Sequence, residues 1–105
     1  MAAKIRGIDD CIEALEDAAD RLTTGTLSAA DAAAMVRTAE GSANLLGLKG
    51  EVLKLELDLA SSKGEQRFLA RELLELEEGM KRFRATLKRV VGQLMETELR
   101  EKKPR

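Results

Sequence analysis

The sequence predicts an all-α protein, with three helices in an elongated antiparallel arrangement, coiled-coil-like packing and a single domain over residues 1–105. Three observations predict it. Charged residues make up 35% of the chain and aromatic residues only 2%, a composition typical of long helices and coiled coils. Apolar residues recur at alternating steps of three and four, which lines one face of a helix. Short segments with glycine or serine separate three such runs, and such segments mark turns.

The first helix is expected over residues ~4–22. Its apolar stripe consists of Ile5, Ile8, Ile12, Leu15, Ala19 and Leu22. The carboxylates on its opposite face, which can stay in water, are Asp10, Glu13, Asp17 and Asp20. Gly25 suits the left-handed backbone that ends a helix, and Ser28 followed by Asp31 suits the N-cap of the next helix.

The second helix, over residues ~29–60, carries two apolar seams. The first seam, which is rich in alanine in its first half, consists of Ala29, Ala32, Val36, Ala39, Ala43, Leu46, Gly50, Leu53, Leu57 and Ala60. The second seam consists of Leu45, Leu48, Val52, Leu55 and Leu59. A helix that is apolar on two sides lies between neighbours. We expect the first helix to cover the alanine half of the first seam, antiparallel to it.

The third helix is expected over residues ~63–100, followed by a charged tail over 101–105 that contains Pro104. Its heptad stripe consists of Leu69, Leu73, Leu76, Met80, Phe83, Leu87, Val90 and Leu94. An unbroken heptad of this length is typical of coiled-coil packing. We expect this stripe to cover the second seam.

The segment Ser61–Gln66 decides between a hairpin and a rod. The register of the second seam continues through Ser62 and Gln66, which favours one continuous helix. Against this, Gly64 and the two serines lower helix propensity by about 2 kcal/mol relative to alanine, and Ser62 with Glu65 forms a capping-box pattern. In a parallel dimer of such rods, two of three charged interhelical pairs would repel. We therefore expect a turn at Ser61–Gly64.

The hairpin leaves apolar side chains without a partner helix. We expect an exposed surface made of Leu46, Leu53, Leu57, Phe68 and Leu74. Such a surface indicates association, so a homo-oligomer is predicted, with another protein as a further partner. The alternative is that these side chains fill an irregular core of the monomer.

Few residues of this chain suit catalysis. It has no histidine or tyrosine and one cysteine, so sites built on histidine or cysteine pairs are excluded. Cys11 stands beside Ile8 and Ile12 and is expected to be a buried apolar residue. Gly47–Gly50 matches the GXXG loop of KH domains, although close helix packing or a bend also explains these glycines. We predict a non-enzymatic protein without catalytic residues, cofactor or metal.

Charge is divided along the chain. Residues 1–60 hold six basic and eleven acidic residues, whereas residues 61–105 hold twelve and eight. The candidate nucleic-acid contacts are Lys81, Arg82, Arg84, Lys88 and Arg89. A basic stripe of this kind suits a phosphate backbone, which makes DNA binding the alternative function. These side chains could instead pair with the acidic face of the first helix or of a second copy.

Targeting signals are lacking at the sequence level. The first ten residues, MAAKIRGIDD, hold no apolar run long enough for a signal peptide. No apolar stretch approaches the roughly 20 residues of a membrane span. A single cysteine fits a reducing compartment. We therefore expect a soluble cytoplasmic protein with no membrane partner.

The stretch LTTGTLSAADAAAMVRTAEGSANLLGLKGEVLKLEL, about residues 22–57, resembles small α-helical proteins encoded by tailed phages and prophages. Gly25 and the pair Leu27-Ser28 stand where that pattern has a short turn before a long alanine-rich helix. The resemblance implies a phage accessory or regulatory factor. Small terminase subunits, which combine helical oligomerisation with DNA binding, are an analogue, and they imply a packaging factor. The chain differs from them in having no clear helix-turn-helix ahead of its long helices.

Overall fold

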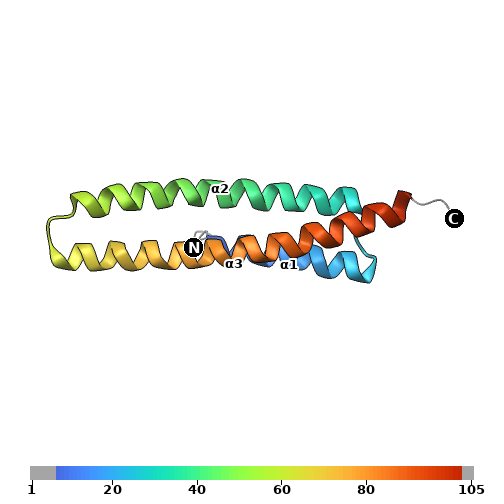
Figure 1. The fold of residues 1–105 in the computed structure, drawn as a ribbon, viewed down its shortest axis with the longest axis horizontal. Helices are drawn as coiled ribbons and strands as arrows, with labels where there is room; N and C mark the ends of the chain where they lie inside the picture. Colours follow the sequence, from blue (N-terminus) through green and yellow to red (C-terminus); the bar gives the residue numbers. More distant parts are fainter. Residues whose placement is uncertain (1–6, 103–105) are drawn as a thin grey trace, which may run out of the picture.

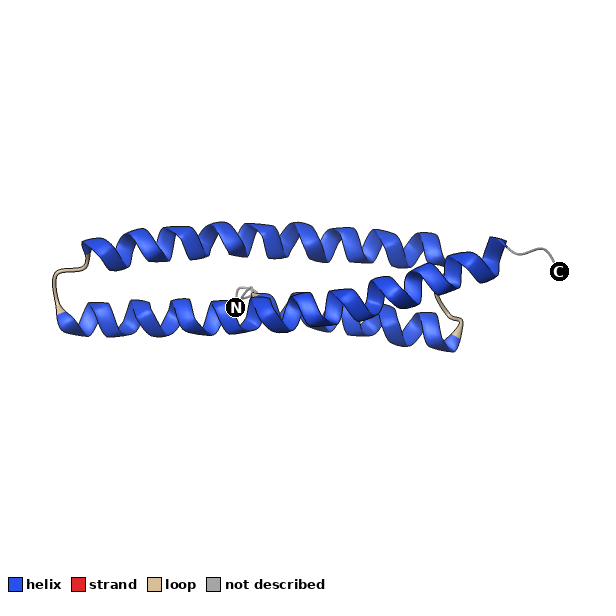
Figure 2. Ribbon diagram, viewed as in Figure 1, coloured by secondary structure: helices blue, strands red, loops and turns tan. Residues whose placement is uncertain are grey.

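The computed structural model describes residues 7–102, which form three α-helices and contain no strand (Figures 1 and 2). The helices are α1 (Ile8–Thr24), α2 (Ala29–Leu59) and α3 (Lys63–Lys102). Helices α2 and α3 run antiparallel along the long axis, whereas α1 lies along only the half that is remote from the α2–α3 turn (Figure 1). At about 1.5 Å per residue, α3 spans about 60 Å and α1 about 25 Å. The elongated molecule is therefore a three-helix bundle at one end and a two-helix hairpin at the other.

Local capping sets the first turn. Gly25 has a φ of 77°, in the left-handed region, and ends α1. The N–H of Thr26 donates to the carbonyl of Arg21 at 2.9 Å, which satisfies one of the last carbonyls of α1. The hydroxyl of Ser28 accepts from the N–H of Asp31 at 3.2 Å and begins α2. Both predicted caps are confirmed. The part of the first helix expected before Gly7, including Ile5, lies outside the described residues.

The predicted hairpin turn is also confirmed. Helix α2 ends at Leu59 and α3 begins at Lys63, so the chain is not a continuous rod. The Ser62 hydroxyl accepts from the N–H of Glu65 at 3.1 Å, as a capping residue does. The Gln66 side chain donates to the carbonyl of Ala60 at 3.2 Å across the turn.

The end of α3 differs from the expectation of a charged tail over 101–105. Glu101 and Lys102 belong to the helix, and residues 103–105 lie outside the described range. A carboxylate oxygen of Glu101 accepts from the backbone N–H of Ala29, the first residue of α2, at 3.2 Å. A helix N-terminus carries a partial positive charge and unpaired N–H groups. This contact, between residues 72 apart in sequence, stabilises the last turn of α3.

The expectation that α3 covers the second seam of α2 is wrong. Both α1 and α3 pack on the first seam: Val36, Ala39 and Ala43 are buried, and so is Leu53, which lies nearer the hairpin turn. With α1 and α3 on opposite sides of α2, the two helices would never touch. Placing both on one side adds a third helix–helix interface, and the small side chains of the first seam allow this close approach.

The shared core lies between all three helices. Its most enclosed side chains are Leu15 of α1 and Val90 of α3, both with 0% exposed surface. The residues predicted for the apolar stripe of α1 from Ile8 to Leu22 are all buried. Cys11 and Ala18, beside that stripe, are buried too, because α1 is covered from two directions.

Gly79 allows α1 and α3 to approach each other closely. It is buried in α3, and a Cβ atom added there would overlap the Cγ2 atom of Ile8. Gly50 of α2 is similarly buried, facing Leu76 of α3, whereas Gly47 faces open space. Because Gly47 and Gly50 lie inside α2, the KH-loop alternative is excluded.

We expect Gly79→Ala to lower the free energy of unfolding by about 1–2 kcal/mol, because overpacking against Ile8 outweighs the gain of about 1 kcal/mol in helix propensity. Gly92→Ala is the matched control, since it lies in the same helix with nothing within 4 Å of an added Cβ. This control should raise stability by about 0.5–1 kcal/mol. Urea denaturation followed by circular dichroism measures both. Equal stabilisation by the two substitutions would contradict the close approach.

Candidate interaction surface

The second seam lies fully on the outside of α2. Its five side chains are exposed by 52% to 83%, from Val52 to Leu59. Their spacing places them at positions a and d of a heptad, and the buried residues of α2 then take positions b and f. On a helical wheel these two pairs of positions lie about 150° apart. Helix α2 therefore presents one apolar face to its own core and a second, continuous apolar face to the solvent.

The residues predicted for an interface differ in exposure and do not form one surface in the structure. Leu53 is only 8% exposed, so the expectation that it belongs to an exposed surface is wrong; α3 covers it. Leu46 and Leu57 are half-buried. Phe68 and Leu74 are exposed, by 61% and 56%, but their spacing of six residues puts them on different sides of α3. The largest continuous apolar stripe is thus the second seam. The heptad spacing of the second seam is visible in the sequence, but we expected the third helix, α3, to cover this seam.

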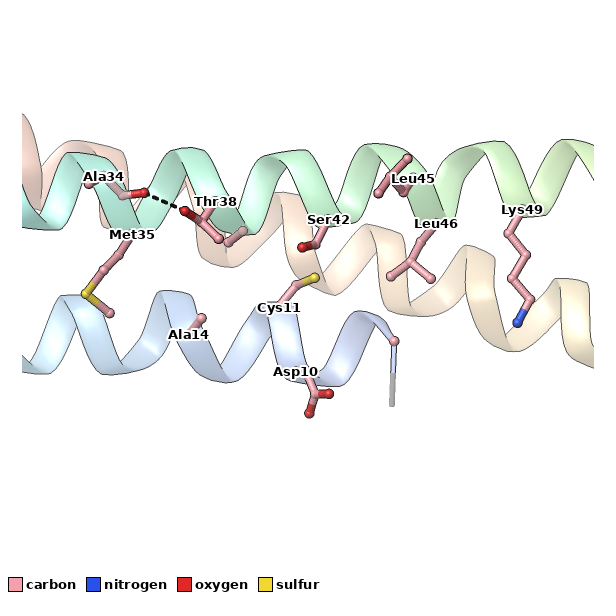
Figure 3. Close-up of a pocket in the computed structure, with 12 residues that line it drawn as sticks. Asp10, Cys11, Ala14, Ala34, Met35, Thr38, Ser42, Leu45, Leu46 and Lys49 are labelled. Carbon is pink, nitrogen blue, oxygen red and sulfur yellow. Dashed lines mark hydrogen bonds between the residues drawn. The ribbon is translucent and has the colours of Figure 1, made fainter. Parts of the chain in front are cut away.

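A groove of about 650 Å³ runs between α1 and α2 beside the second seam (Figure 3). Small side chains line much of it, among them Ala14 of α1 and Ala34, Thr38 and Ser42 of α2. The Thr38 hydroxyl donates to the carbonyl of Ala34 at 3.1 Å, so this polar group is satisfied within its own helix. Leu45, the first residue of the second seam, also lines the groove, which continues along α2 to Lys49.

Cys11 lies at the floor of this groove and is only 5% exposed, which confirms its predicted burial. Burial, and secondarily the charge of Asp10, raises the pKa of the thiol. A raised pKa disfavours the thiolate, the reactive form. In the part of the chain that the structure describes, no group of three histidine, cysteine or acidic residues is placed to hold a metal ion.

The raised pKa of Cys11 gives a testable pH dependence. As pH rises through the ordinary thiol pKa of about 8.5, the unfolded chain loses its proton before the folded chain does. We expect the free energy of unfolding to fall as the pH rises above about 8.5. In Cys11→Ala this slope should be smaller. Urea denaturation at several pH values measures it, and identical slopes in the two proteins would contradict the prediction.

The basic residues of α3 are all exposed but do not form one stripe. Lys81, Arg84 and Lys88 share one side of the helix by their spacing, and Arg82 and Arg89 share another. A guanidinium nitrogen of Arg82 lies 3.4 Å from a carboxylate oxygen of Asp9 in α1. Arg82 thus pairs with an acidic residue of the first helix, although Asp9 is not one of the four carboxylates of the predicted acidic face.

None of the described helices is both long enough and apolar enough to span a bilayer. No protein-family model matches the chain, and no curated protein or solved structure is significantly similar to it.

Proposed function

We propose that this chain is a non-enzymatic assembly protein that binds a second copy of itself through the second seam. The observation that carries the proposal is the exposure of five large apolar side chains at consecutive a and d positions, on a face that the chain's own helices leave uncovered. Soluble monomers rarely leave a continuous apolar stripe in water. Helical stripes with this spacing pack against other helices.

The expected gain is large enough for a stable complex. Covering a half-exposed leucine or valine contributes roughly 1–2 kcal/mol. Five such side chains from each of two copies therefore contribute about 10–20 kcal/mol. Association costs about 4–15 kcal/mol in lost freedom of motion. The gain exceeds the cost over most of these ranges, which favours association of two copies.

Size-exclusion chromatography with light scattering tests the proposal directly. We expect a mass of twice the 11.5 kDa of one chain, falling toward one chain on dilution. A mass of one chain that persists up to a protein concentration of about 100 μM would overturn the proposed self-association. In that case another protein becomes the expected occupant of the second seam.

DNA binding is the second candidate function. It is favoured by four exposed basic side chains on α3 besides Arg82: Lys81, Arg84, Lys88 and Arg89. Their division between two sides of the helix fits one phosphate backbone poorly. We expect no binding of a labelled duplex at low salt in fluorescence anisotropy. Binding that weakens steeply with salt, and less steeply in Lys81→Ala with Lys88→Ala, would support this function instead.

A role as a phage accessory factor is part of the first proposal. It rests on the resemblance of residues ~22–57 to small phage and prophage proteins, read from the turn and cap pattern. The capped turn at Gly25 and Ser28 supports that pattern. A single buried thiol is in keeping with a reducing, cytoplasmic setting.

A further inference from the structure

We propose that the second seams of two copies pair antiparallel about a two-fold axis, so that Leu45 of one copy faces Leu48 of the other. This inference rests on the proposed self-association and specifies its geometry. In this register each layer pairs an a position with a d position of the other copy, and the two residue numbers of a layer sum to 93. The paired parts of α2 then cover residues 34–59, most of the helix.

Side-chain size favours the antiparallel direction. The outer face of α2 is small before the second seam, where Ala34, Thr38 and Gly41 are exposed at the a and d positions. An antiparallel partner lays its large residues over this small half. The resulting layers, repeated on both sides of the axis, are Gly41 with Val52, Thr38 with Leu55, and Ala34 with Leu59. A Cβ added at Gly41 would meet nothing within 4 Å, so there is room for the valine.

In a parallel pair, the small half of one face would not lie opposite the large half of the other. It would set large residues against large ones at one end and small against small at the other, leaving a poorly filled gap. It would also place Glu51 against Glu56 of the second copy, which are repelling charges. Helix α1 borders this face along the groove that Ala34, Thr38 and Leu45 line, and α3 packs on the other side of α2, against Gly50. The a and d positions themselves are exposed, so size and charge decide between the two arrangements.

Flanking charges select the register among antiparallel ones. In the proposed register, Arg37 lies beside Asp58 of the second copy, at both ends of the interface; both side chains are exposed. A shift of one heptad toward the hairpin turn sets Glu51 against Glu51 and Lys49 against Lys49. A shift of two heptads sets Glu51 against Asp58, which offsets the attraction of Lys49 for Glu56 in that register, and it leaves only residues 48–59 of α2 paired. Like charges in these flanking positions destabilise the pairing.

A shift of one heptad in the other direction avoids repulsion but buries a charge. It would place Leu55 over Asp31, at the a position nearest the start of α2. An unpaired carboxylate against a leucine is costly. The proposed register is thus the one that has an attractive flanking pair, no repelling flanking pair, and apolar or small residues in each layer.

Disulfide cross-linking between separately purified variants tests the direction. Leu45→Cys and Leu48→Cys are each made in a Cys11→Ala background, one with an affinity tag, and oxidised alone and as a mixture. We expect cross-linking at least about tenfold faster in the mixture than in either variant alone, because only the mixture holds facing thiols within disulfide reach. Fast cross-linking of Leu45→Cys by itself would show parallel pairing and overturn the proposal.

Further mixtures test the register. Thr38→Cys with Leu55→Cys should cross-link like the first pair. Faster cross-linking of Leu45→Cys with Leu55→Cys, or of Val52→Cys with Leu55→Cys, would show a shifted register and overturn the proposal while leaving self-association intact. A monomer in light scattering would instead refute the proposed function itself, so the two failures are distinguishable.

Exchanging the charges of Arg37 and Asp58 tests the register through the dimer Kd, without cysteines in the interface. Arg37→Asp and Asp58→Arg should each raise the dimer Kd about fivefold, and the double variant should restore it to within about twofold. Lys54→Asp is the control for net charge, because its position c lies off the face; it should leave Kd unchanged. A double variant that is weaker than both single variants would overturn the pairing of Arg37 with Asp58.

Discussion

Replacing Leu15 by alanine is expected to lower the free energy of unfolding by about 3 kcal/mol. Leu15 has 0% exposed surface at the centre of the core shared by the three helices. Truncation of Leu15 removes apolar contacts and leaves a cavity. Helices α2 and α3 could close this cavity only by moving as whole helices. For a small domain such a loss is a large fraction of the total stability.

Thermal unfolding at a fixed protein concentration measures this effect. A loss of about 3 kcal/mol corresponds to a fall in Tm of about 12–20 °C for a domain of this size. The concentration is held constant because association with a second copy also shifts Tm.

Met95→Ala serves as the matched truncation at an exposed site. Met95 is 59% exposed on α3, outside the core and the second seam, so its loss should change stability by less than about 0.5 kcal/mol. A loss below about 1 kcal/mol for Leu15→Ala would mean that α1 does not dock on the other two helices as the structure has it.

The helix boundaries could be predicted because short-range chemistry sets them. Gly25 needs no partner outside its own turn to adopt a left-handed backbone, and Ser28 and Ser62 each cap the residue three positions later. These signals can be read within a few residues of sequence. The turn between α2 and α3 was predictable for the same reason, even though the heptad register runs through it.

The side of α2 that each neighbour covers could not be predicted in this way. Both seams of α2 are apolar and both have helical spacing, so periodicity gives no preference between them. The choice depends on contacts between distant residues, such as Gly79 with Ile8 and Glu101 with Ala29. The contact of Gly79 with Ile8 exists only when α1 and α3 share one side of α2. For that reason the exposed surface predicted from the sequence included Leu53, which is buried, and did not include the second seam.

The same arrangement leaves one half of the molecule less enclosed than the other. At the hairpin end α2 and α3 have no third helix, and Leu59 and Phe68 are exposed by 83% and 61%. Two helices alone cannot enclose side chains on all sides. In the proposed dimer, a helix from a second copy lies along the second seam and gives this half of the molecule a third neighbouring helix.

Introducing charge into the second seam is expected to abolish self-association. In Leu48→Glu with Leu55→Glu, a dimer would have to bury four carboxylates, two from each copy, without partners. Each unpaired charge in an apolar interface costs several kcal/mol. We expect Kd to rise at least about 1,000-fold, so that light scattering gives the mass of one chain at every accessible concentration. Helix content should be retained, since both side chains are 62% exposed in the single chain.

Leu74→Glu with Leu99→Glu is the matched control for this variant. These residues are exposed to a similar degree, 56% and 67%, and the change in net charge is identical, but they lie on α3 outside the second seam. This control should keep the dimer mass, because a general increase in negative charge alone is screened at physiological salt. If the α3 variant dissociated and the α2 variant remained dimeric, the interface would belong to α3. Loss of the dimer only on α2 would tie association to the face that the fold of the single chain leaves uncovered.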